Sequence, residues 1–264
     1  IVNLFLQKYI MKNLLILLIP PIFIRLKNYF RNRYFGYLFW GRYSNLDEFK
    51  NFIKEDTYLL KEQHQQSVKN YLKNKEIYNF DLRNSFLPIF VSSLSDINLK
   101  ILDIGGGFNS CFKYINKSQK KNIDVTVLER DEIVTSIKEL GEIDKNVQYT
   151  NEIISNDYEI IFFGSSIQYF LEFKKIKEIV TKCSAQYIII VDTAFTQVDE
   201  DIFSLQVNMF PSLIPYKINS ISKIENKFNK LNYNLIYKSK RSCGKHKHLN
   251  KNQLFSRDLI FKRS

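Results

Sequence analysis

Cysteine and histidine are scarce in this chain of 264 residues, and their spacing does not suit the usual cross-links. The three cysteines, Cys111, Cys183 and Cys243, lie far apart and form no Cys-x-x-Cys pair. This spacing argues against a disulfide framework and a structural zinc site, and it favours a reducing compartment such as the cytoplasm. Three histidines are too few for an obvious metal site, so the sequence predicts no bound metal.

A membrane-spanning apolar run is also lacking. The apolar segment 14–24 has only 11 residues and contains Pro20-Pro21, whereas a spanning helix needs about 20 residues and proline breaks a helix. No small-residue cleavage site follows it, so we expect no signal peptide. Residues 25–35 interleave Arg and Lys with aromatic side chains, which is typical of a peripheral membrane anchor. A helix packed on the domain with a basic outer face is an equal alternative.

Acidic residues are outnumbered by basic ones, and the formal net charge is +12. Such an excess can indicate nucleic acid or an anionic membrane as a partner. No Arg-rich run or recognised nucleic-acid motif accompanies the charge. The chain is rich in Lys, Asn, Ile, Phe and Tyr, the residues of AT-rich codons, and this bias accounts for much of the charge. We therefore expect no nucleic-acid partner.

Helical and strand patterns alternate from residue 96 onward. The predicted strands are 99–104, 123–128, 147–150, 158–163 and 186–191, and the predicted helices are 109–116, 131–140 and 171–183. This alternation predicts an α/β fold with a mostly parallel, doubly wound sheet. A further helix over 221–231 is followed by strands 233–237 and 254–261, which fit an antiparallel pair at one edge.

Two regions are predicted along the chain. Residues 1–95 form an apolar and basic segment with a helical cap, whose helices cover 46–73 and 79–95. Ser44 or Asn45 can cap the first of these helices. Residues 96–264 form the sheet domain.

A glycine-rich turn follows the first predicted strand. Gly105, Gly106 and Gly107 allow a sharp turn and close approach of a ligand, at an entropic cost that a plain strand-turn-helix does not need. Asp103, just before the turn, can reach an amine or hydroxyl of a small molecule. Glu129 lies 26 residues later, at the end of the second strand, where a carboxylate can accept both ribose hydroxyls.

The pattern of the turn favours one cofactor. A dinucleotide site requires G-x-G-x-x-G, but Ser110 stands at the third position. The Asp-x-Gly-x-Gly form found here is the S-adenosylmethionine version. Ligands of open parallel sheets bind at the carboxyl ends of the strands, so we expect Asn151, Ser165 and Gln168 to contact the cofactor as well.

Methyl transfer is an in-line displacement in which positioning supplies most of the rate, although an oxygen acceptor can require a general base. The candidate catalytic residues are Asp192, Tyr169 and His246. Tyr169 can instead pack on the adenine or the acceptor. His246 lies in the basic loop 238–251, which either holds an anionic acceptor or is simply solvated.

Several motifs together resemble a family of S-adenosylmethionine-dependent methyltransferases encoded with surface-polysaccharide (O-antigen or capsule) genes. The matching residues are Pro20-Pro21, Trp40-Gly41-Arg42-Tyr43-Ser44, Asp47-Glu48, Leu102–Gly107, Leu128-Glu129, Gly164–Tyr169, Asp192–Phe195, Gln206-Val207 and Pro215. The departure is Phe108-Asn109, where such families often have another small residue.

The resemblance implies a Rossmann-like class I methyltransferase that binds S-adenosylmethionine. Its acceptor is expected to be a small molecule or glycan, with O-methylation of a sugar of a cell-surface polysaccharide or its precursor. The expected location is the cytoplasm or the inner membrane face. Two alternatives stay open: a non-catalytic Rossmann-like scaffold in a glycan assembly complex, and an NAD(P)-dependent sugar enzyme, against which the missing third glycine counts.

Overall fold

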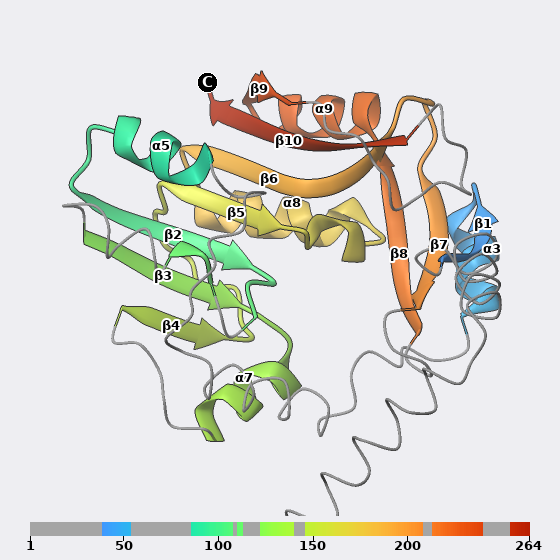
Figure 1. Cartoon of the computed structure of the whole chain (residues 1–264), viewed down its shortest axis with the longest axis horizontal. Coiled ribbons are helices and arrows are strands. Elements are labelled where there is room, and N and C mark those ends of the chain that lie inside the picture. The colour runs from blue at the N-terminus through green and yellow to red at the C-terminus, as the bar shows by residue number, and fades with distance from the viewer. Residues whose placement is uncertain are drawn as a thin grey trace, which may run out of the picture.

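The structure is a computed structural model that describes residues 39–53, 86–107, 110–112, 122–139, 146–207, 213–239 and 254–264. These residues contain a ten-stranded sheet (Figure 1). Its parallel part has the order β4-β3-β2-β5-β6. The bounds of these strands are β2 Asn98–Ile104, β3 Asn122–Leu128, β4 Val147–Thr150, β5 Ile160–Gly164 and β6 Tyr187–Thr196. The predicted parallel, doubly wound sheet is confirmed.

Both faces of β2 are buried, which explains its near-continuous apolar sequence. The side chains of Leu102 and Ile104 belong to the core on one face, and those of Leu99 and Ile101 belong to the core on the other. Because β3 pairs with one edge of β2 and β5 with the other, this strand is central in the sheet.

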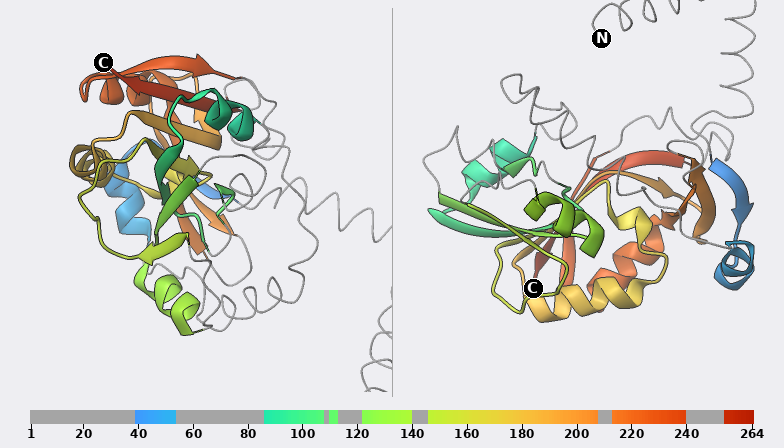
Figure 2. Two further views of the ribbon diagram at one scale, coloured as in Figure 1. Left: turned by 90° about the vertical axis from the view of Figure 1, so that its left-hand side faces the viewer. Right: turned by 90° about the horizontal axis from the view of Figure 1, so that it is seen from below.

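Helices cover the two faces of the sheet (Figure 2). α8 (Phe173–Cys183) and α9 (Ile221–Asn229) pack on one face. α5 (Phe86–Ser93) and α7 (Asp131–Glu139) pack on the other. In α8 the buried residues Ile176, Ile179, Val180 and Cys183 recur at helical spacing, which gives this helix its apolar stripe.

The predicted antiparallel pair at the edge is also confirmed. β10 (Leu254–Arg263) pairs antiparallel with β6 and with β9 (Tyr233–Lys238). β9 is therefore the edge strand at this end of the described sheet, and β4 is the edge strand beyond β3.

The sequence did not predict a second, antiparallel section of the sheet. β8 (Leu213–Ser220) pairs with β7 (Ile202–Val207), and β7 pairs with β1 (Phe39–Tyr43). β6 was predicted to end at residue 191 but continues to Thr196. β8 pairs in parallel with the last two residues of β6, along the edge of β6 where the pairing with β5 has ended.

The N-terminal part of the described chain supports this second section. α3 (Leu46–Phe52) follows β1, and the Asn45 side chain accepts a hydrogen bond from the Asp47 N–H at 2.8 Å, as predicted for a cap. The Phe49 ring is fully buried against Phe203 of β7, with ring centroids 5.7 Å apart.

Some predictions fall on residues that the structure does not describe. They are the N-terminal segment 1–38, residues 54–73 and 79–85 of the two predicted N-terminal helices, most of the predicted helix 109–116, and the loop 240–253. Among the helices of the described ranges, none combines the length and the apolar character needed to cross a bilayer.

Phe228 tests the packing of α9 on the sheet. Its fully buried ring contacts Phe261, with centroids 4.7 Å apart, and meets Phe173 edge-on at 5.4 Å. We expect Phe228→Ala to lower the free energy of unfolding by about 3–5 kcal/mol, because it removes a large apolar side chain and leaves a cavity. Urea denaturation measures the loss. Ile236→Ala, at a side chain that is 52% exposed, is the control and should change stability by no more than about 0.5 kcal/mol.

Candidate functional site

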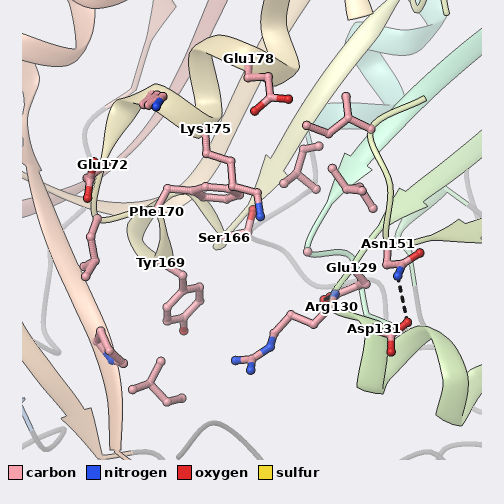
Figure 3. Close-up of a pocket in the computed structure, with 18 of the residues that line it drawn as sticks. Glu129, Arg130, Asp131, Asn151, Ser166, Tyr169, Phe170, Glu172, Lys175 and Glu178 are labelled. Carbon is pink, nitrogen blue, oxygen red and sulfur yellow. Dashed lines mark hydrogen bonds between the residues drawn. The ribbon is translucent and has the colours of Figure 1, made fainter. Parts of the chain in front are cut away.

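The order in which strands are added to the sheet reverses at β2, and the site lies at this reversal. From β2 the chain proceeds to β3 and β4 on one side and then to β5 and β6 on the other. Crevices at such switch points, outside the carboxyl ends of the strands, are the usual ligand sites of open α/β sheets. A cleft of about 910 Å³ lies here. Figure 3 shows Glu129, Arg130 and Asn151 on one side of it and Tyr169, Phe170 and Glu172 on the other.

The glycine turn forms the floor of the cleft at the end of β2. Gly105 lines the cleft with φ +70° and donates its N–H to the carbonyl of Leu128 at 2.9 Å. A Cβ at this position would lie 2.8 Å from the Ser166 Cβ. A Cβ at Gly106 would overlap the carboxylate of Asp103. The turn therefore needs glycine both for its backbone conformation and for close contact with its neighbours.

Asp103 lies beneath the turn rather than in the cleft. Its side chain is only 1% exposed, and Oδ1 has no hydrogen-bond partner among the described residues. The pKa of Asp103 is raised to about 7, mainly by burial; the side chain of Ser110 opposes the rise, and the negative charge of Glu129 adds to it. An acid that still holds its proton near neutral pH in a site is a common mark of function.

Glu129 is the carboxylate that borders the cleft directly. Its Oε1 accepts the N–H of Gly107 at 3.0 Å, and its Oε2 accepts the N–H of Arg130 at 3.1 Å. Burial raises the pKa of Glu129, while these two hydrogen bonds and the charge of Arg130 lower it. Its orientation is fixed by the turn after β2 and by its own strand end. The glycine turn and Glu129, which together form the predicted ribose site, are thus joined by a hydrogen bond.

Asn151 extends the same side of the cleft. It follows β4, and its Nδ2 donates to Oδ1 of Asp131, the first residue of α7, at 2.9 Å. Both residues line the cleft.

A hydrogen bond links Ser165, the residue after β5, with Asp192 inside β6. Both residues adopt left-handed backbone conformations, with φ +56° and +50°, which non-glycine residues usually keep only for a structural or functional reason. Ser165 lines the cleft, and its hydroxyl is shared between two acceptors of Asp192, the carbonyl oxygen at 3.0 Å and Oδ2 at 3.1 Å. Asp192 stands outside the set of cleft-lining residues, so its carboxylate connects to the cleft through Ser165.

A bulge in β6 explains the conformation of Asp192. Val191 and Asp192 together lie opposite a single residue of β10, Asp258. The buried carboxylate of Asp258 accepts the N–H of Asp192 at 3.0 Å and the hydroxyl of Ser239 at 3.1 Å. The sequence pattern gave no signal for Asp258, because it falls among the apolar residues of a C-terminal strand.

Gln168 and Tyr169 come from the short 3₁₀ helix η2 (Ile167–Tyr169). Gln168 is 3% exposed and outside the cleft lining; its amide donates to the carbonyl of Ser165, and its oxygen accepts from Thr193. Tyr169 lines the cleft and donates its hydroxyl to Gln206 at 3.0 Å. Burial raises the pKa of Tyr169, against the opposing hydrogen bonds of Gln168 and Gln206. A phenol with a raised pKa stays protonated at neutral pH, which favours a packing or hydrogen-bonding role over that of a base.

The second section of the sheet supplies part of the cleft that the sequence did not predict. Ile214 and Pro215 of β8 line it, and Lys50 of α3 joins them by an ion pair with Glu172, the residue before α8. Buried Lys217 of β8 holds this wall from behind, donating to the carbonyl of Leu171 at 3.0 Å. Burial lowers the pKa of Lys217 to about 8.

The predicted site residues separate into three groups. Gly105, Glu129, Asn151, Ser165 and Tyr169 line one cleft. Asp103, Gly106, Gly107, Gln168 and Asp192 lie around it as supports of these residues. His246 lies outside the described residues. Across the described ranges, no group of three His, Cys, Asp or Glu side chains is placed to hold a metal ion.

The sheet order and the cleft at its switch point define the class I methyltransferase fold. Among solved structures, the chain is similar to an S-adenosylmethionine-dependent methyltransferase from Methanosarcina mazei, with a TM-score of 0.50 and 10% identity over 67% of this chain and 97% of that one. It is also similar to the pyocyanin biosynthetic protein PhzM, with a TM-score of 0.50 and 10% identity over 89% of this chain and 71% of that one. At such identities the likeness concerns the fold.

By sequence, no protein-family model and no curated protein matches the chain.

Two glycines of the turn provide a matched test of its geometry. Gly105 combines a positive φ with a Cβ position 2.8 Å from Ser166, whereas Gly107 has φ +59° and open space around its Cβ position. We expect Gly107→Ala to cost about 1–2 kcal/mol for its left-handed backbone alone, and Gly105→Ala to cost more. Urea denaturation of both variants measures the difference. Equal losses would contradict the close packing of the turn on Ser166.

Asp103 should make stability depend on pH. Its folded-state pKa of about 7 lies above the ordinary value of 3.8, so the folded protein keeps a proton that the unfolded chain releases. The free energy of unfolding should therefore fall as the pH rises from about 4 to about 7, by at most about 1.4 kcal/mol per pH unit. Asp103→Asn, which cannot ionise, should flatten this slope in denaturation curves recorded from pH 4 to 8. Asp124→Asn on the exposed side of β3 is the control and should keep the slope; a slope unchanged in Asp103→Asn would refute the assignment.

Proposed function

We propose that this chain is an S-adenosylmethionine-dependent methyltransferase that methylates an oxygen of a sugar. The observation that carries the proposal is the junction of Glu129 with the glycine turn, at the switch point of a class I methyltransferase fold. A carboxylate fixed at the end of the strand next to a glycine turn is suited to the two hydroxyls of a ribose. The name of the Methanosarcina mazei structure supports the same cofactor.

The residues around the turn fit such a cofactor. Gly105 lines the cleft and carries no side chain, so a ligand can approach its backbone closely. The hydroxyl of Ser166, a residue that lines the cleft, has no hydrogen-bond partner among the described residues. Orphaned buried polar atoms are rare unless a ligand or water satisfies them.

Each residue then has a proposed role. Glu129 would hold the ribose, Asn151 would face the base, and Ser165 and Ser166 would contact the remainder of the cofactor, with Asp103 and Gln168 supporting the turn and the β5 end from below. Bound S-adenosylmethionine supplies an electrophilic methyl group on sulfur. The protein's contribution is to hold the acceptor oxygen in line with that group and to exclude water.

Asp192 remains the proposed base for the acceptor hydroxyl. Its carboxylate already accepts the Ser165 hydroxyl, which borders the cleft. A proton released by the acceptor would therefore pass to Ser165 as the serine proton moves to Asp192. Tyr169 would pack against the acceptor and donate a hydrogen bond.

The acceptor side of the proposal has different support. A cleft of about 910 Å³ is near the upper end of the range for small-molecule sites, which leaves space for an acceptor beside a nucleoside cofactor. The sequence resemblance supports a sugar of a surface polysaccharide or its precursor. The basic and aromatic residues 25–35 support peripheral contact with the inner membrane face, and the cysteine spacing supports the cytoplasm.

Isothermal titration with S-adenosylhomocysteine tests the cofactor. We expect binding by the full chain and a loss of about 10- to 100-fold in affinity for Glu129→Gln, because a charged hydrogen bond contributes about 1.5–3 kcal/mol. Glu200→Gln, an exposed residue outside the cleft, is the charge-matched control and should bind normally.

Two outcomes would oppose the proposal. A folded chain that binds no S-adenosylhomocysteine would favour a non-catalytic scaffold. Binding of NAD in its place, in a parallel titration, would favour the NAD(P)-dependent sugar enzyme.

A further inference from the structure

A series of hydrogen bonds leads from the C-terminal strand β10 to the cleft. It begins at Asp258, which is 1% exposed and whose carboxylate accepts the N–H of Asp192 at 3.0 Å. Asp192 in turn accepts the Ser165 hydroxyl with its carbonyl oxygen at 3.0 Å and with Oδ2 at 3.1 Å. Ser165 lines the cleft. A buried carboxylate of the last strand is therefore connected to the edge of the sheet at which a ligand can bind.

Asp258 is itself held firmly in place. The hydroxyl of Ser239 donates to its Oδ2 at 3.1 Å and accepts its N–H at 2.8 Å, and the N–H of Ser239 donates to its carbonyl at 2.9 Å. These bonds fix Asp258 opposite the bulge of β6, where Asp192 has φ +50°. This backbone conformation is unfavourable for residues other than glycine, so the hydrogen bond from Asp258 helps to maintain it.

The same bonds decide what the Ser165 hydroxyl offers to a ligand. A hydroxyl has one hydrogen and two lone pairs. Both contacts with Asp192 use the hydrogen, because carbonyl and carboxylate oxygens only accept. Ser165 therefore borders the cleft as a hydrogen-bond acceptor, with the carboxylate of Asp192 directly behind it. An ammonium group of a ligand suits this arrangement, whereas a carboxylate of a ligand does not.

The strand order indicates which part of the cofactor Ser165 meets. Asn151, Glu129, Gly105 and Ser165 directly follow β4, β3, β2 and β5, which are successive neighbours in the sheet and lie about 4.8 Å apart. In the proposed function, Asn151 faces the base and Glu129 holds the ribose. The substituent at the 5′ carbon of the ribose then extends across the glycine turn toward Ser165. In S-adenosylmethionine this substituent carries an amino acid, whose ammonium group can donate to Ser165.

We propose that Asp258 is a positioning residue for the cofactor: through Asp192, it holds the Ser165 hydroxyl as the acceptor for the ammonium group. The proposal rests on the proposed function, which supplies the cofactor and its orientation. Asp258 acts only through Asp192 and contacts no part of the cofactor. The second lone pair of the Ser165 oxygen stays available to the hydroxyl of the methyl acceptor.

Isothermal titration of the full chain with two ligands tests this role. The ligands are S-adenosylhomocysteine and 5′-methylthioadenosine, which keeps the nucleoside and the sulfur but lacks the amino acid. We expect Ser165→Ala to bind S-adenosylhomocysteine about tenfold more weakly, because it removes a hydrogen bond to a charged group. Asp258→Ala should show a loss of up to the same size. Neither change should alter the affinity for 5′-methylthioadenosine.

Two further variants separate positioning from a general structural effect. The double variant Asp258→Ala/Ser165→Ala should bind S-adenosylhomocysteine no more weakly than Ser165→Ala alone, because both changes act on one contact. Asp258→Asn keeps an oxygen that can accept the N–H of Asp192, and it should restore most of the affinity.

Asp201→Ala is the matched control. It removes a carboxylate that also accepts a backbone N–H, that of Ser220 at 2.8 Å, at a residue outside the cleft, and it should bind both ligands normally. Urea denaturation reports whether each variant is folded. If Asp258→Ala does not fold, Ser239→Ala takes its place. This change removes the hydroxyl that anchors Asp258 and should cause a smaller loss that is equally selective for S-adenosylhomocysteine.

The outcomes separate this role from the proposed function. Equal losses for the two ligands in Asp258→Ala would show a purely structural role and would overturn the inference. Losses that add in the double variant would also overturn it, because Asp258 would then act apart from Ser165. If Ser165→Ala binds S-adenosylhomocysteine as tightly as the wild type, the ammonium group lies elsewhere; the inference is then wrong and the proposed function stands. If the folded wild-type chain does not bind S-adenosylhomocysteine, both proposals are wrong.

Discussion

The parallel pairing of β2 with β3 and β5 is the constraint on which the site depends. Backbone hydrogen bonds at the strand ends hold Gly105 to Leu128, Glu129 to Thr150 and Ser165 to Val191, at 2.9, 2.9 and 3.0 Å. These bonds continue the register of the sheet into the loops. They bring a glycine turn, a carboxylate and a serine from separate segments to one edge, where a ligand can meet all three.

Burial of polar groups around this edge gives the site its electrostatic character. Asp103 lies in the core beneath Gly106 and keeps its proton close to neutral pH. Lys217 is buried behind the opposite wall, and burial lowers its pKa to about 8. A buried charge is costly unless it is neutralised or well hydrogen-bonded. Asp103 is therefore close to its neutral form at neutral pH and supports the turn, whereas Lys217 still carries its proton there and is stabilised by its hydrogen bond to the carbonyl of Leu171.

The antiparallel section β1-β7-β8 turns the edge of the sheet into a cleft. It exists because β6 continues beyond β5 and offers a free edge to β8. Ile214 and Pro215 of β8 then line the cleft, and α3 brings Lys50 to Glu172. This wall of the cleft is thus built from parts of the chain that lie more than 50 residues before or after the glycine turn.

Local sequence determined the parallel sheet, its helices, and the glycine turn with Glu129 at one side of the cleft. Short apolar runs predicted the strands, and apolar residues at helical spacing predicted the helices. Both patterns follow from which side chains of the element itself are buried. Asp103, the glycines and Glu129 were identified because strand ends and a glycine turn leave local signals. Residues that support the site through long-range hydrogen bonds left no such local signal. Asp258 of β10 accepts the N–H of Asp192, and Lys217 of β8 donates to the carbonyl of Leu171.

Only the tertiary structure decided the wall of the cleft that β8 and α3 supply. β7 and β8 carry buried polar residues such as Ser204, Lys217 and Asn219, so the strands lack the simple apolar pattern by which β2 was found. Their partners are set by long-range pairing with β6 and β1, and which lysines of a lysine-rich chain face the cleft depends on the same packing. The sequence by itself determined the glycine turn and the carboxylate beside it, because these depend on a strand and its turn. The opposite wall of the cleft required the fold, because distant segments build it together.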